Sequence, residues 1–137
     1  MRRLVCAFVV VAAFTVAAST APAAAPSLRR IASHCSPSGD VCYGIFTRNR
    51  VVLLRISTAA HYFSRYTLCV KGPGGGAAGY VRCGSFPVFR QSGSTWGSTV
   101  RHARQYPVVG PGTYRVTWML NGQALGPTLR FRLPTRR

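Results

Sequence analysis

The chain has 137 residues and carries 17 arginines and one lysine against a single acidic side chain, Asp40, so its net charge is +17. Carboxylates supply most general acids and bases and most ligands of hard metal ions, so one carboxylate argues against an enzyme. The positive charge attracts polyanions, although a coding bias toward arginine would raise the arginine count without any function.

Residues 1–25 have the pattern of a secretory signal peptide. Two arginines follow the first methionine, residues 4–18 form an almost unbroken apolar run, and residues 23–25 are alanines. The apolar run of 15 residues is shorter than the roughly 20 that cross a bilayer as a helix. We therefore expect cleavage after Ala25, to within about two residues, and secretion to the extracellular space or the cell envelope. One domain with a net charge of +15 would remain.

Four cysteines follow this segment: Cys35, Cys42, Cys69 and Cys83. An even number in a small exported chain is typical of two disulfides, and four cysteines allow three connectivities. We favour Cys35 with Cys42, which bracket a Ser-Pro-Ser-Gly-Asp turn, and Cys69 with Cys83, which bracket a glycine-rich hairpin. Neither C-x-x-C nor H-x-x-x-H spacing is present, so we do not expect zinc.

Short runs of β-branched and aromatic residues, separated by turn residues, predict an all-β protein. The expected strands before the C-terminal third are residues 50–56, 66–70, 80–83, 86–90 and 96–102. Residues 57–65 have the composition of one helical turn, and the glycine-rich residues 71–79 predict a loop.

The sequence divides into four parts. Residues 1–25 are the expected signal peptide, and residues 26–41 are interpreted as an N-terminal extension that contains the disulfide-closed turn. Residues 42–133 are expected to form the folded domain, and residues 134–137 a basic C-terminal tail.

The C-terminal third has the clearest pattern. Residues 113–120 alternate, with apolar side chains on one face, and Asn121-Gly122 favours the positive φ angles of a type I′ turn. The returning strand, residues 128–133, alternates in the same way. The outer face of this hairpin carries Arg115, Arg130 and Arg132. These arginines are the candidate polyanion-binding residues, and an ordinary solvated sheet face is the alternative.

The run Pro-Gly-Thr-Tyr-Arg-Val-Thr-Trp at residues 111–118 resembles the penultimate strand of an immunoglobulin-like β-sandwich, with Tyr114 at the position of a tyrosine corner. The inter-sheet cysteine pair of antibody domains is missing, because Val116 stands where the second of those cysteines would fall. The resemblance is therefore to the sandwich as a fold. We expect an all-β, immunoglobulin-like β-sandwich of about seven strands with two disulfides.

Within that class, the hairpin is similar to the last hairpin of the secreted bacterial copper-binding sandwiches of the CopC type. In that family a G-T-Y-x-V-x-W strand runs into a D-G-H turn, and the turn histidine and an N-terminal histidine bind copper. Here the turn reads Asn121-Gly122-Gln123, and the expected mature N-terminus offers no histidine. The resemblance implies the fold but not the copper site, and a copper carrier with altered ligands is the alternative function. The hairpin is also similar to small exported proteins of high-GC bacteria, for which membership implies no activity.

Three histidines lie in separate segments with no motif around them: His34, His61 and His102. Asp40, the only acidic partner for a catalytic triad, lies in the disulfide-closed turn, where local backbone bonding is its expected role. The expected protein is thus a non-enzymatic binding module without metal or cofactor. Its expected partner is an anionic cell-envelope polymer or lipid surface, and no specific nucleic acid.

Overall fold

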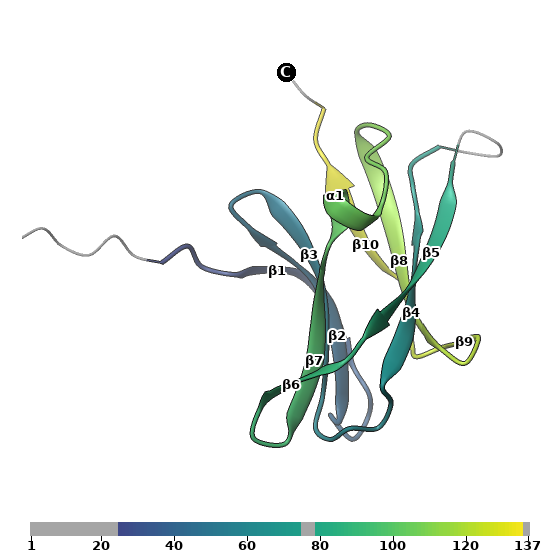
Figure 1. Ribbon diagram of the computed structural model, residues 1–137. Helices are drawn as coiled ribbons and strands as arrows, with labels where there is room; N and C mark the ends of the chain where they lie inside the picture. The colour runs from purple at the N-terminus through teal and green to yellow at the C-terminus, as the bar shows by residue number, and fades with distance from the viewer. Residues whose placement is uncertain (1–24, 75–78, 136–137) are drawn as a thin grey trace, which may run out of the picture.

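The computed structural model describes residues 25–74 and 79–135, which form two antiparallel β-sheets packed face to face (Figure 1). The first sheet has the strand order β1-β2-β3-β7-β6, and the second has the order β10-β8-β4-β5, with β9 paired to β8. The strands are β1 Arg29–Cys35, β2 Val41–Arg48, β3 Val51–Thr58, β4 Arg65–Lys71, β5 Val81–Pro87, β6 Phe89–Ser92, β7 Thr95–Arg101, β8 Gly112–Leu120, β9 Gln123–Ala124 and β10 Leu129–Leu133. One short helix, α1 His102–Gln105, follows β7.

The predicted all-β sandwich with two disulfides is confirmed. The described residues contain ten strands where about seven were expected, because β1, β2 and β9 had no clear local pattern. β1 is an edge strand whose side chains are mostly exposed, and β2 buries three consecutive residues. Neither strand therefore shows the apolar alternation that marks a strand in a sequence.

The expected boundary at residue 42 was wrong. Residues 29–35, expected to belong to an extension, pair with β2 from Arg29 opposite Thr47 to Cys35 opposite Cys42, and so belong to the first sheet. The helical turn expected at residues 57–65 is also wrong, since the end of β3, a loop and the first residue of β4 occupy this segment. Residues 1–24 of the expected signal peptide and residues 136–137 of the expected tail lie outside the described residues.

Inward-facing residues of both sheets build the core. The most deeply buried apolar side chains are Ile45, Leu54 and Ile56 of the first sheet and Tyr66, Leu68, Val70, Tyr114, Val116 and Trp118 of the second. Tyr43 of the first sheet stacks on Trp118 of the second, with ring centroids 4.7 Å apart. Because this apolar surface is removed from water between the sheets, its burial is the main force that holds them together.

The C-terminal hairpin has the expected geometry. The hydroxyl of Tyr114 donates a hydrogen bond of 2.8 Å to the carbonyl of Gly110, which is the predicted tyrosine corner. Asn121 and Gly122 have φ angles of 51° and 78°, as a type I′ turn requires. Alternation along β8 then places Arg115 outward, between the buried Tyr114 and Val116.

Replacing Tyr114 by phenylalanine should lower the free energy of unfolding by about 1 kcal/mol, because the tyrosine-corner hydrogen bond is lost while the ring stays in the core. Urea denaturation of wild type and Tyr114→Phe measures this difference. Tyr62→Phe is the control, because the Tyr62 side chain is 55% exposed and its hydroxyl lies outside the core. Equal stability of Tyr114→Phe and wild type would show that this bond does not hold the corner.

Both predicted disulfide pairings are confirmed. Cys35–Cys42 joins opposite residues of β1 and β2, and Cys69–Cys83 joins opposite residues of β4 and β5, each with a Cα–Cα distance of 4.0 Å. Such bonds form and persist in oxidising compartments. Among the residues that the structure describes, no helix is both long and apolar enough to span a membrane.

Candidate anion-binding site

The outer face of the second sheet carries three basic side chains on three neighbouring strands. Lys71 of β4 lies opposite Arg115 of β8, and Arg115 lies opposite Arg130 of β10. Neighbouring strands are about 4.8 Å apart, so the three side chains start within about 10 Å of one another. We call Lys71, Arg115 and Arg130 the cationic row.

All three members of the cationic row are exposed. The predicted outward orientation of the three candidate arginines is confirmed, since Arg132 is exposed as well. Arg132 lies opposite Thr113, one step further along the face, and is therefore a neighbour of the row. The structure thus brings the three candidate arginines together and adds a lysine to them.

Lys71 was missed in the sequence because it was assigned to the glycine-rich loop. In the structure it is the last residue of β4, on the same face as Cys69. The alternation of Tyr66, Leu68 and Val70, all buried, was the local signal for its outward direction. Its position opposite Arg115 depends on the pairing of β4 with β8, which no local pattern specifies.

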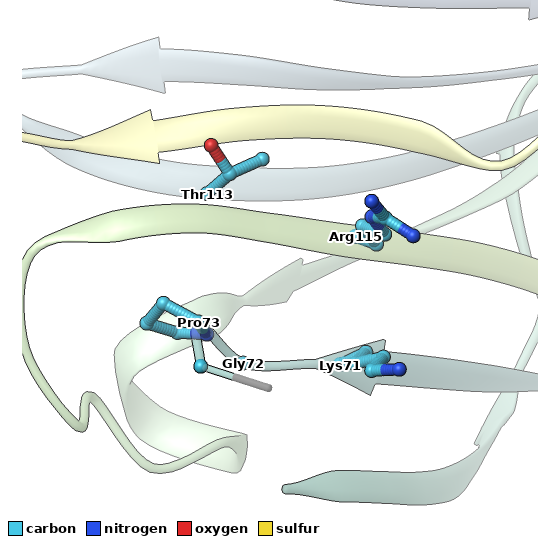
Figure 2. Close-up of a pocket in the computed structure, with 6 residues that line it drawn as sticks. Lys71, Gly72, Pro73, Thr113 and Arg115 are labelled. Carbon is cyan, nitrogen blue, oxygen red and sulfur yellow. The ribbon is translucent and has the colours of Figure 1, made fainter. Parts of the chain in front are cut away.

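A hollow of about 260 Å³ lies beside the cationic row and is lined by Lys71, Gly72, Pro73, Gly74, Thr113 and Arg115 (Figure 2). Figure 2 shows Lys71 and Arg115 at the same level of neighbouring strands. The wall of the hollow depends on Gly112, where a Cβ atom would come within 2.6 Å of Pro73. Glycine therefore lets the chain after β4 pack closely against the start of β8.

The electrostatics of the cationic row are unfavourable without an anion. Like charges directly opposite each other on neighbouring strands destabilise a sheet, and here two such pairs share Arg115. The only acidic side chain, Asp40, lies in the turn between β1 and β2 of the other sheet. Guanidinium groups bind phosphate, sulfate and carboxylate oxygens strongly, so an anionic ligand would relieve this repulsion.

The histidines do not form a site together. The ring centroids of His34 and Tyr43 are 5.4 Å apart. His61 stacks on Trp96, with ring centroids 4.0 Å apart. Trp96 is half-buried and packs against the core. Within residues 25–74 and 79–135, no three His, Cys, Asp or Glu side chains are grouped as metal ligands would be.

The remaining residues singled out in the sequence lie apart from the cationic row. Asp40 is in the expected turn, where its backbone N–H donates to the hydroxyl of Ser38 and the backbone N–H of Val41 donates to the hydroxyl of Ser36. Gln123, which replaces the copper-binding histidine of the similar family, is exposed in β9.

Comparison of the chain with protein-family models, with curated proteins and with solved structures found no match.

Proposed function

We propose that this protein is an exported, non-enzymatic module that binds an anionic polymer of the cell envelope through the cationic row. The observation that carries the proposal is the register of Lys71, Arg115 and Arg130 across three neighbouring strands. A linear polyanion lying across these strands would meet a cation about every 5 Å. Arg132 and the hollow beside Lys71 extend the contact surface.

A polymer suits this face better than a lipid surface. The neighbours of the cationic row on β8 are Thr113 and Thr117, so the centre of the face is polar. The exposed large apolar side chain on this face is Val81, which lies opposite Lys71. Peripheral proteins bind lipid more strongly when several apolar side chains enter the acyl region. One valine at the sheet edge would bury little apolar area in a bilayer.

Export rests on two observations in the chain. Residues 1–25 have the composition of a cleaved signal peptide. The two disulfides suit an oxidising compartment, and a mature chain there would meet the anionic polymers of the envelope directly.

The mature protein should bind immobilised polyphosphate and heparin, with an affinity that falls steeply as salt rises from about 50 to about 500 mM, because binding releases counterions from the polyanion. Surface plasmon resonance at several salt concentrations measures the slope, and neutral dextran of similar length is the control. Anionic vesicles test the lipid alternative. Salt-independent binding, no binding at low salt, or stronger binding to vesicles than to both polymers would contradict the proposal.

A further inference from the structure

A larger hollow, of about 720 Å³, is lined by residues of the β2–β3 hairpin, α1 and the end of β10. Figure 1 shows these elements at the same end of the sandwich. Its apolar lining residues are Val51, Val52, Ala103, Val108, Val109, Pro111, Leu133 and Pro134. Val51, Val108 and Val109 are 38%, 48% and 54% exposed, which is unusual for three large apolar side chains in one place. We call this hollow the apolar groove.

His102 lines the apolar groove and is 1% exposed. Its ring lies against Tyr106, Tyr114 and Phe131, with centroids 5.0 to 6.0 Å away. Burial lowers the pKa of His102 to about 4, so the imidazole is neutral near pH 7. His102 therefore adds no charge to the groove at physiological pH.

Arg50 supplies a positive charge at the rim of the apolar groove. Asn49 and Arg50 are the two central residues of the β2–β3 hairpin and have φ angles of 50° and 64°. Asparagine followed by glycine is the favoured pair in such a turn, and a long side chain at the second position is strained. Strained residues of this kind are concentrated at binding and catalytic sites.

Arg132 adds a second cation next to the apolar groove. It lines an adjoining hollow that shares Pro111, Leu133 and Pro134 with the groove. The apolar surface is thus bordered by arginines, and its lining includes no acidic side chain. A ligand that matches this surface has a long apolar chain and one negatively charged end.

We propose that the apolar groove binds a long-chain fatty acid. The alkyl chain lies against Val51, Val108 and Val109, and the carboxylate pairs with the Arg50 guanidinium. The volume is within the range of about 300 to 1,000 Å³ that is typical of small-molecule sites. The lining of this groove includes no member of the cationic row, so either proposal can fail without the other.

The test measures binding of palmitate to the mature wild-type protein by titration calorimetry, with hexadecanol as the uncharged analogue of equal chain length. Palmitate should bind about tenfold more tightly than hexadecanol, because a charge-assisted bond to Arg50 is worth about this factor. Arg50→Gly should reduce palmitate affinity about tenfold and leave hexadecanol unchanged. This variant should also unfold at a higher urea concentration than wild type, since glycine accepts the positive φ.

Two further variants distinguish binding in the groove from a general effect of the protein's positive charge. Val109→Asp places a carboxylate in the groove and should abolish palmitate binding, and its exposed position lets the chain fold. Arg104→Gln removes a cation from α1 that does not line the groove and should bind palmitate like wild type. The proposal is overturned if palmitate does not bind, if hexadecanol binds as tightly, or if Arg50→Gly keeps wild-type affinity. Tight binding of an envelope peptide in place of palmitate would also overturn it.

Discussion

Acidification from pH 7 to pH 4 is expected to lower the free energy of unfolding by roughly 3 kcal/mol through His102 alone. Burial lowers the pKa of His102 from 6.5 to about 4. The unfolded chain therefore binds this proton below about pH 6.5, whereas the folded protein binds it only near pH 4. The contribution of His102 to stability is fully present above pH 6.5 and is lost as the pH falls to 4. It amounts to about 1.36 kcal/mol for each unit of pKa difference.

The composition of the chain makes this effect unusually easy to assign. Acid unfolding in most proteins comes mainly from carboxylates that are paired or hydrogen-bonded in the native state. Here Asp40 is the only acidic side chain. The groups packed on the ring of His102 are Tyr106, Tyr114 and Phe131, and Arg50 lines the same groove, so none of the described residues places an anion against the protonated imidazole.

Urea denaturation at pH 7, 5.5 and 4 measures the loss of stability. His102→Met is the test variant, because methionine is neutral at every pH and flexible enough to fill an irregular core site. Its free energy of unfolding should fall much less between pH 6.5 and pH 4 than that of wild type, whatever its stability at pH 7. His34→Gln is the control and should decline like wild type. A His102→Met protein that is as acid-sensitive as wild type would show that another group is responsible.

Removal of the cationic row should weaken polyphosphate binding about 100-fold at low salt. The triple variant carries glutamine at Lys71, Arg115 and Arg130. Each lost contact should lower the slope of log affinity against log salt by about 0.7 to 0.9, so the total change is about 2 to 3. The variant should also be more stable than wild type at low salt, because two like-charge pairs are removed from the sheet.

The matched control carries glutamine at Arg29, Arg48 and Arg101, which are exposed residues of the first sheet. It loses the same net charge as the row variant but keeps the row. Its salt slope should therefore stay near that of wild type. If the two triple variants weaken binding equally, the overall charge of the protein drives attachment, and the row is not a site.

Much of the C-terminal hairpin could be predicted, because the signals for it are local. Alternation along residues 113–120 places Tyr114 inward and Arg115 outward, and Asn121-Gly122 sets a two-residue turn. The disulfide pairing followed from the short segments between the cysteines. β1 could not be predicted in the same way, since an edge strand with exposed side chains gains its structure from its partner strand.

By itself, the sequence determined the all-β class, the direction of most side chains in the last hairpin and the shortage of carboxylates. Only the tertiary structure placed Lys71 opposite Arg115, buried His102 among aromatic rings and put Arg50 beside three exposed valines. The physical reason is the range of the interactions. Alternation and turns depend on backbone preferences of neighbouring residues, whereas a site depends on which distant strands pair and in which register.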